Sequence, residues 1–479
     1  MTVRLLVPAY GKQTNALYTG TTVAERALID AGQADNNLSA SFDYAAYLDG
    51  KSIASIVPGL SAPVIDAAGG LTAQSAGTLA QRLLRSAQRG ITPIRTVLAS
   101  SPTYSEGANG ANSTINPGSS TGLRGGLYQP DNSSRVTPLG GPIIVDPNNG
   151  ARFRQQTRIA TYSNLARTGG HGSGIRFATQ AQAFDIAINF IANGDKLALY
   201  VTDPTTGIRA RGQAADYTQT NTGMAYRKWD FGSRALRIIE LYWGPNTSCA
   251  SLNVASTETI YAVPDSDQLK TLVLSDSWFD GGGINNTGLP NPIKLNSCDF
   301  LGERLGVGNI YSAAVSGTGV VAGDQNATSG SFIQRVQAGD IDSLRIGLMD
   351  AIYVNVSGND ASATDADVQA GYATLIQLVR TAQPKALIFG AGPQNITTRV
   401  PTQSRFNAAR DGFAAGAGGD PRCIYLDNSY TGENWIPTPM VTNVNMGPDG
   451  DHPNELFAQY YGWRIADSMI AATKLRFGL

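Results

Sequence analysis

The pattern of apolar positions indicates two differently built regions in the chain. Between residues 141 and 264, apolar residues alternate with others, as at Phe184, Ile186 and Ile188, and turn sequences such as NGD at 193–195 separate the alternating segments. A period of two with short turns predicts antiparallel strands whose apolar faces pack together. We therefore expect a jelly-roll-like β-sandwich over 141–264.

From residue 265 to residue 479 the apolar residues form short continuous runs instead. These runs are KTLVLSDS, DAIYVNVSGND, KALIFGAGP and RCIYLDNS, and helix-like stretches such as DVQAGYATLIQLVRTAQ lie between them. Continuous apolar runs are typical of strands that are buried on both faces of a parallel sheet. Ligands of such folds bind at the carboxyl ends of the strands, so the polar residues that end the runs are the candidates for chemistry.

Two further segments precede the sandwich. We expect a small mixed unit over residues 1–98. The sequence TVAE at 22–25 fits a capping box, which predicts the start of a helix. The apolar spacing near 72–88 predicts a second helix. Residues 99–140 are rich in Gly, Ser, Asn and Pro and lack an apolar period, which predicts a linker.

Composition excludes several classes of function. Lys and Arg number 36 against 37 Asp and Glu, so the net charge of −1 argues against a nucleic-acid binder that depends on phosphate contacts. No apolar stretch is long enough for an N-terminal secretion signal or a membrane span. With only 2 His and 3 widely spaced Cys, the chain offers neither a metal site nor a disulfide framework, and we expect no cofactor.

Four short motifs at the predicted strand ends carry the candidate chemistry. Ser277 lies in SDSW, Gly317 in SGTG, Asn359 in SGND, and Asp449 and His452 lie in DGDHPN. A serine hydroxyl becomes a nucleophile only when a base takes its proton, and an aspartate can orient a histidine base. A side-chain amide can donate a hydrogen bond to a developing oxyanion. The set therefore predicts a serine hydrolase.

In their order and their positions, these motifs resemble the four blocks of the SGNH, or GDSL-type, hydrolase superfamily over roughly 266–479. The resemblance implies a three-layer α/β/α domain and gives each residue a role. Ser277 matches the nucleophile, His452 the general base, and Asp449 the carboxylate that orients the base. Gly317 and Asn359 match oxyanion-hole donors, together with the backbone N–H of Ser277.

The motifs depart from the family pattern at two positions. Ser275 stands where the first block usually has Gly, and Ser357 stands where the third block usually begins with Gly. Neither position is a catalytic group in the family, but Ser275 could tighten the turn that precedes the nucleophile.

A β-sandwich ahead of an SGNH domain resembles carbohydrate esterases, which implies removal of O-acetyl or other O-acyl groups from a polysaccharide through an acyl-enzyme. Trp278 and Trp435 lie near the motifs and could stack on sugar rings or pack in the core. The N-terminal unit resembles the leading segments of phage virion proteins. Without a secretion signal, this predicts a tail-associated protein assembled in the host cytoplasm, with virion tail proteins or further copies of this chain as partners.

Three alternatives stay open at this point. The hydrolase-like domain could be an inactive tail or adhesion module that only binds carbohydrate. A lipase or thioesterase is a further alternative, although no long apolar lid segment flanks the nucleophile. The run from Gly317 to Ala322 also fits the dinucleotide pattern G-x-G-x-x-A with Asp340 downstream, but a strand that ends at Ser277 already precedes it, where the first βα turn should lie.

Overall fold

The computed structural model describes residues 2–4, 17–19, 73–89, 96–108, 110–111, 113–115, 136–140, 143–146, 149–155, 173–190, 196–220, 223–243, 247–263, 269–280, 296–323, 330–394, 400–436, 446 and 451–479. The chain divides into two compact units, Met1–Ser75 with Pro264–Ser266, and Ala76–Val263 with Asp267–Leu479. In the first unit, β1 (Thr2–Arg4) pairs antiparallel with β2 (Leu17–Thr19). The helix expected after 22–25 lies outside the described residues.

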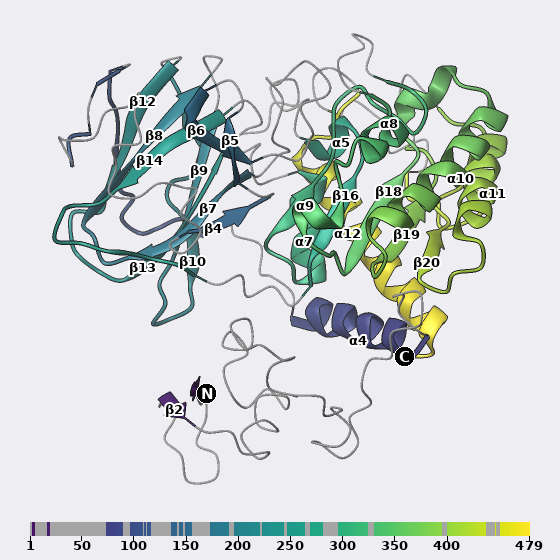
Figure 1. The fold of residues 1–479 in the computed structure, drawn as a ribbon, viewed down its shortest axis with the longest axis horizontal. Coiled ribbons are helices and arrows are strands. Elements are labelled where there is room, and N and C mark those ends of the chain that lie inside the picture. The colour runs from purple at the N-terminus through teal and green to yellow at the C-terminus, as the bar shows by residue number, and fades with distance from the viewer. Residues whose placement is uncertain are drawn as a thin grey trace. The chain divides into compact units, whose positions relative to one another are not determined.

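The region predicted as a β-sandwich contains two antiparallel sheets (Figure 1). One sheet has the order β10-β9-β13-β7-β15, with β11 beside β9 and β4 beside β7. The other sheet has the order β3-β12-β8-β14-β6-β5. The bounds in the first sheet are β4 (Thr137–Leu139), β7 (Ser173–Thr179), β9 (Lys196–Thr202), β10 (Arg209–Arg211), β11 (Tyr217–Thr218), β13 (Arg237–Trp243) and β15 (Ile260–Tyr261). Those in the second are β3 (Thr103–Glu106), β5 (Ile143–Asp146), β6 (Asn149–Gln155), β8 (Ala183–Phe190), β12 (Gly223–Asp230) and β14 (Thr247–Asn253).

The alternating apolar residues of the sequence fill the core between these sheets. Phe184, Ile186 and Ile188 on β8 are fully buried in one cluster, which also contains Trp229 and Trp243. Because every second residue of a strand points to the same face, the alternation places these side chains together. The predicted sandwich is confirmed, and both of its tryptophans belong to the core.

The range 99–140, expected to be a linker, contributes two strands to the sandwich. β3 pairs with β12, and β4 pairs with β7. β3 is held by polar and aromatic contacts: Glu106 forms an ion pair of 2.8 Å with the fully buried Arg227, and Tyr104 packs against Trp229. The apolar pattern of the sequence does not predict this strand, because β3 is held by the ion pair of Glu106 and the ring of Tyr104 rather than by a series of apolar side chains.

The C-terminal region contains a parallel sheet with the order β17-β16-β18-β19-β20. Its strands are β16 (Thr271–Leu274), β17 (Ile310–Ser312), β18 (Ala351–Asn355), β19 (Leu387–Ala391) and β20 (Cys423–Leu426). Every residue of β16, β18 and β19 is buried, as the continuous apolar runs predict. The order along the sheet reverses between β16 and β18, which makes their carboxyl ends the expected place for a ligand.

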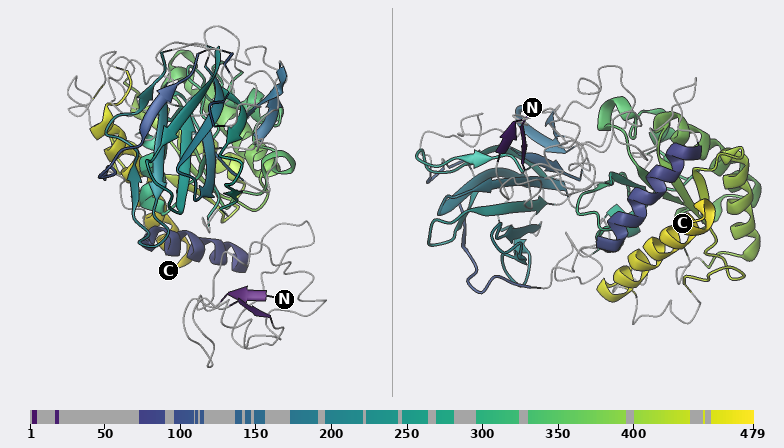
Figure 2. Two further views of the ribbon diagram at one scale, coloured as in Figure 1. Left: turned by 90° about the vertical axis from the view of Figure 1, so that its left-hand side faces the viewer. Right: turned by 90° about the horizontal axis from the view of Figure 1, so that it is seen from below.

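Helices cover both faces of this sheet (Figures 1 and 2). On one face lie α5 (Ser277–Asp280), α7 (Ser297–Leu305) and α12 (Glu455–Phe477), and on the other α8 (Phe332–Gln337), α10 (Asp365–Ala382) and α11 (Gln403–Ala417). Short helical turns, α9 (Ser343–Ile346) and η4 (Gly358–Ser362), lie in the connections. The predicted α/β/α architecture is confirmed.

Helix α4 (Ala73–Arg89) confirms the helix expected near 72–88, but its partners lie in the α/β domain. Arg82 donates two hydrogen bonds to Asp350, at 2.8 and 3.1 Å, and Ser86 Oγ donates to the carbonyl of Gly306. Asp350 directly precedes β18 and also accepts the backbone N–H of Lys270, before β16. Helix α4 is therefore bound at the amino-terminal edge of the parallel sheet, opposite the edge where ligands are expected.

Candidate functional site

Ser277 lies where β16 ends and is the first residue of α5. Its side chain is half-buried, so the hydroxyl group is not part of the core. The residue two positions earlier, Ser275, is fully buried, and its Oγ donates a 2.6 Å hydrogen bond to Oδ1 of Asn355 at the end of β18. This bond joins the carboxyl ends of the two strands that flank the reversal in strand order.

The neighbours of Ser277 connect it to the segment that carries His452. The Asp276 carboxylate is buried and accepts the backbone N–H of Trp278 at 3.1 Å and Nε2 of Gln394 at 3.4 Å. Trp278 Nε1 in turn donates a 3.0 Å hydrogen bond to the carbonyl of Asp451. Because Asp451 directly precedes His452, this bond fixes the histidine segment beside the turn of Ser277.

His452 is half-buried and lies just before α12. Asn454 caps that helix, since its side chain accepts the backbone N–H of Phe457 at 3.0 Å. A capped helix start holds the preceding residues in place. Asp449, the predicted orienting carboxylate, lies outside the described residues.

The two predicted oxyanion donors lie at the ends of the neighbouring strands. Gly317, with φ of 75°, is in the turn after β17, and Asn359 is in η4 after β18. Asn359 Nδ2 donates to the carbonyl of Thr318 at 3.1 Å and to Ser357 Oγ at 3.0 Å. The amide thus lies against the segment of Gly317, and both of its hydrogens have acceptors.

The structure therefore brings four of the five predicted catalytic residues to one edge of the sheet. All four of these residues are half-buried: Ser277, Gly317, Asn359 and His452. Their segments follow the ends of strands or are joined by hydrogen bonds. Their roles in a reaction stay predictions.

The glycine-rich run from Gly317 to Ala322 holds a carboxylate of the chain itself. The backbone N–H groups of 320–322 donate to Asp360 at 2.9, 3.0 and 3.1 Å. A Cβ on Gly319 would lie 2.5 Å from that carboxylate. Burial raises the pKa of Asp360 above its ordinary value, because desolvation outweighs the backbone hydrogen bonds that lower it.

This contact removes the basis for the dinucleotide alternative. Consecutive backbone N–H groups in such a run could bind a phosphate, but here Asp360 occupies them. Asp340, the residue that would bind a ribose, is instead paired at 3.0 Å with the buried Arg335.

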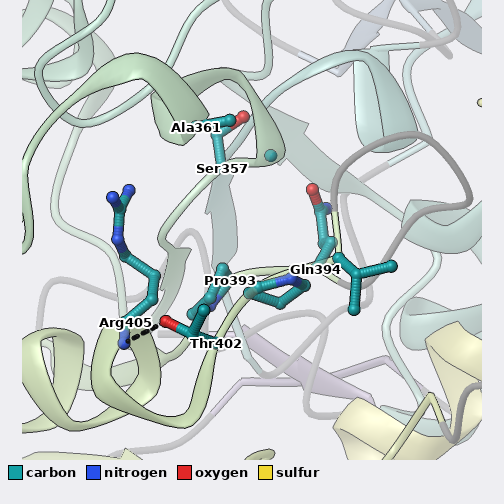
Figure 3. A pocket seen from close by; sticks show the side chains of 9 residues that line it. Ser357, Ala361, Pro393, Gln394, Thr402 and Arg405 are labelled. Carbon is teal, nitrogen blue, oxygen red and sulfur yellow. Dashed lines mark hydrogen bonds between the residues drawn. The ribbon is translucent and has the colours of Figure 1, made fainter.

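A cavity of about 220 Å³ adjoins the oxyanion segment (Figure 3). Its lining residues are Ser357, Gly358, Ala361, Pro393, Gln394, Val400, Pro401, Thr402 and Arg405. Gln394 is buried and also contacts Asp276, so one wall of the cavity lies close to the turn of Ser277. The guanidinium of Arg405 is held by Asp365 at 2.6 Å and by the carbonyl of Asp360 at 2.8 Å, so its charge is already compensated.

The two tryptophans near the motifs are packing residues in this structure. Trp278 is 4% exposed, and its ring makes edge contacts with Phe457 and Tyr461. Trp435 is fully buried, and its Nε1 donates to Glu433 at 2.8 Å. Both rings pack against Tyr461 of α12, and Trp278 also holds the segment of His452 through its bond to Asp451. A role of either tryptophan in sugar binding stays a prediction.

Among the described residues, no group of three or more His, Cys, Asp or Glu side chains is arranged to hold a metal ion. No helix in the described part of the chain has the length and apolar character needed to cross a membrane. The three cysteines are buried and are not joined to one another.

Comparison with known proteins finds similarity at the level of structure. No protein-family model and no curated protein matches the sequence. A salicylyl-acyltransferase from a tetracycline biosynthetic pathway superposes with a TM-score of 0.53 at 14% identity, over 72% of this chain and 98% of the other. An acetyl xylan esterase from Butyrivibrio proteoclasticus gives 0.50 at 13% identity, over 73% of this chain and 99% of the other.

A third structure is an active-site mutant of a family two carbohydrate esterase from Clostridium thermocellum, in complex with cellohexaose. It superposes with a TM-score of 0.50 at 15% identity, over 68% of this chain and 98% of the other. The chain has the fold of the family two carbohydrate esterases. The match covers nearly the whole of each esterase, so the β-sandwich and the α/β domain both belong to the shared fold, whereas the identity is too low to transfer an activity.

Proposed function

We propose that this chain is a serine esterase that removes O-acyl groups, in particular O-acetyl groups, from a polysaccharide. The observation that carries the proposal is the bond from Trp278 Nε1 to the carbonyl of Asp451, which joins the turn of Ser277 to the segment of His452. The carbohydrate esterases and the acyltransferase that share the fold support the proposal, because all are named for acyl chemistry.

In the proposed reaction, His452 takes the proton of Ser277 Oγ as the oxygen attacks the ester carbonyl. Asp449 holds the other nitrogen of the imidazole and stabilises its charged form. The backbone N–H groups of Ser277 and Gly317 and the amide of Asn359 donate to the oxyanion. The tetrahedral intermediate then expels the sugar alkoxide, which takes the proton from His452, and water hydrolyses the acyl-enzyme by the same steps.

The hydrogen bonds of Asn359 place a condition on this reaction. Both Nδ2 hydrogens have acceptors in the structure, Thr318 O and Ser357 Oγ. Donation to an oxyanion therefore has to share or replace one of these bonds. The carbonyl of Thr318 is the acceptor next to Gly317, so the proposal is that the oxyanion competes with this carbonyl.

The cavity that adjoins the oxyanion segment has room for a short acyl group. Pockets that enclose drug-sized ligands have volumes of roughly 300–1,000 Å³. The cavity beside Ser357 and Gln394 has about 220 Å³. An acetyl group fits within this volume, and comparing short with long esters tests this choice against the lipase alternative.

The test is acetate release by the full chain from a panel of acetylated polysaccharides, compared with hydrolysis of p-nitrophenyl acetate and p-nitrophenyl palmitate. Labelling by a fluorophosphonate reports whether Ser277 is activated, with Ser277→Ala as the control. We expect acetate release, preference for the short ester, and labelling that the variant abolishes. A folded wild-type chain that is neither labelled nor active would instead support a carbohydrate-binding module without catalysis.

Loss of Ser277 should remove activity without unfolding the chain. Ser277 is half-buried at the start of a one-turn helix, so Ser277→Ala removes a hydroxyl that the core does not use. The kcat should fall by several powers of ten, with a melting temperature close to that of the wild type. A kcat within about tenfold of the wild type would contradict the assignment.

A further inference from the structure

The hydroxyl of Ser357 lies between the residue before the nucleophile and the predicted oxyanion amide. Ser357 is 2% exposed at the end of β18, and its Oγ donates to Oδ2 of Asp276. The same Oγ accepts the backbone N–H of Asn359 at 3.0 Å and Nδ2 of Asn359 at 3.0 Å. A glycine at this position would make none of these side-chain bonds.

The direction of these bonds follows from the number of hydrogens. A serine hydroxyl has one hydrogen, and here the Asp276 carboxylate takes it. Toward Asn359, Ser357 Oγ can therefore only accept. The carboxylate is itself oriented by the backbone N–H of Trp278, which can only donate.

The second partner of the amide imposes the same orientation. Nδ2 of Asn359 lies 3.1 Å from the carbonyl oxygen of Thr318, which accepts and does not donate. If the amide were rotated by 180°, Oδ1 would face two acceptor oxygens and both hydrogen bonds would be lost. The surroundings of Asn359 thus select one of its two amide orientations.

We propose that Ser357 is a positioning residue for the Asn359 amide. Because Asp276 takes the only hydrogen of its hydroxyl, Ser357 Oγ accepts from Nδ2 of Asn359 and keeps this nitrogen on the side of Gly317 and Thr318. This inference rests on the proposed esterase function. It assigns to Ser357 the task of presenting a donor, rather than an acceptor, to the oxyanion.

A purely structural role for Ser357 makes different predictions. Its side chain also caps η4, because it accepts the backbone N–H of Asn359 while Asp360 accepts the backbone N–H of Ser357. Loss of a cap destabilises the turn whatever the side chain at position 359 is. The two roles can therefore be separated by changing both residues.

The experiment is a double-mutant cycle on the full chain with p-nitrophenyl acetate. It compares the wild type, Ser357→Ala, Asn359→Ala and the double variant, by kcat, KM, melting temperature and fluorophosphonate labelling of Ser277. We expect Asn359→Ala to lower kcat by about 10²–10³-fold and Ser357→Ala to lower it by about 10-fold, with KM little changed. In the Asn359→Ala background, Ser357→Ala should lower kcat no further, because the amide it orients is absent.

Two further variants serve as matched controls. Ser357→Thr keeps the hydroxyl and should retain more of the wild-type kcat than Ser357→Ala does. Ser275→Ala removes a buried hydroxyl that also joins β16 to β18, but its acceptor is Oδ1 of Asn355 rather than Asp276. It should lower the melting temperature as Ser357→Ala does and leave kcat within about threefold.

Equal losses of kcat from Ser357→Ala in both backgrounds would overturn the inference, as would a wild-type kcat for a folded Ser357→Ala variant. Failure of the proposed function has another signature, since a wild-type chain without activity and without labelling of Ser277 would overturn both. If the wild type is labelled and active, but Ser357→Ala lowers kcat by the same factor with and without Asn359→Ala, only the positioning role is overturned.

Discussion

Two aspartates, Asp449 and Asp451, precede His452 in the sequence DGDHPN, and only one of them can be the residue that orients the imidazole. Adjacent side chains diverge, so Asp451 faces away from its neighbour His452 most easily, whereas a turn at Gly450 can return Asp449 to the ring. The backbone of Asp451 already has a task, because its carbonyl accepts Nε1 of Trp278.

We therefore predict that Asp449→Asn lowers kcat by up to about 10⁴-fold, through the wrong imidazole tautomer and the lost negative charge. Asp451→Asn keeps the backbone carbonyl and should change kcat by less than about tenfold. Steady-state kinetics on p-nitrophenyl acetate decide between them. A larger loss of kcat in Asp451→Asn than in Asp449→Asn would reverse the assignment.

The places of Ser277 and Asn359 after the ends of strands could be predicted from the sequence, but the hydrogen bonds between their segments could not. Ser277 and Asn359 follow strands whose apolar runs are unmistakable, and parallel strands bring their carboxyl ends to one edge. The bond from Ser357 to Asp276 joins residues 81 apart in sequence, and the contact of Asp360 with Val320 joins residues 40 apart. Such bonds depend on tertiary packing, which local patterns do not contain.

At the scale of strands, a buried ion cluster crosses the first sheet of the sandwich. Glu240 on β13 pairs at 2.7 Å with Arg176 on β7 and also contacts Arg209 on β10. Burial alone would raise the pKa of Glu240, but the charges of Arg209 and Arg176 outweigh desolvation and lower the pKa from 4.5 to about 2. The charged carboxylate is therefore favoured in the folded state.

Because of this cluster, we predict that the unfolding free energy of the sandwich decreases as the pH is lowered. Because the pKa of Glu240 is lower in the folded than in the unfolded state, its contribution is complete above about pH 5 and is lost as pH falls toward 2. The loss is on the order of 3 kcal/mol of unfolding free energy. Urea unfolding across this pH range should show it in the wild type.

Glu240→Gln is the informative comparison. It cannot titrate, so its unfolding free energy should be lower than that of the wild type near neutral pH and should fall less between pH 5 and pH 2. Parallel pH dependences in the two proteins would show that Glu240 is not the group responsible.

Helix α4 has its partners far away in the sequence. Arg82 binds Asp350 across 268 residues, and the apolar side of the helix buries Ala80 and Leu83 completely. The 3.6-residue period predicted the helix itself, while its docking to the parallel sheet had no signal in the neighbouring residues.

We predict that a chain beginning at residue 73 keeps the melting temperature of the α/β domain, whereas a chain beginning at 99 lowers it. The second chain exposes the surface that α4 covers and leaves Asp350 without the guanidinium of Arg82. Calorimetry of both chains measures the difference. Equal melting temperatures would show that α4 contributes nothing to the stability of the domain.

At the scale of the whole molecule, the two architectures were predictable because their periods differ. Apolar residues alternate with other residues over 141–264, which predicts the sandwich. They form continuous runs over 265–479, which predicts the parallel sheet, so the two regions can be told apart by pattern. The range 99–140 was harder, since β3 is held by Glu106 and Tyr104 rather than by an apolar series. The virion tail location expected from the N-terminal unit stays a prediction.

The position of α4 has a consequence for the connectivity of the molecule. Along the chain, α4 comes first, the strands of the sandwich follow, and β16 of the parallel sheet comes after them. Helix α4 nevertheless contacts the edge of this same sheet. The sandwich is therefore an insertion within the α/β domain, with one covalent tether on each side. A protease that cuts only the connection between β15 and β16 would not release the sandwich from the α/β domain. The sandwich is still joined covalently to α4, and α4 is bound to the parallel sheet, so the two fragments should elute together in size-exclusion chromatography.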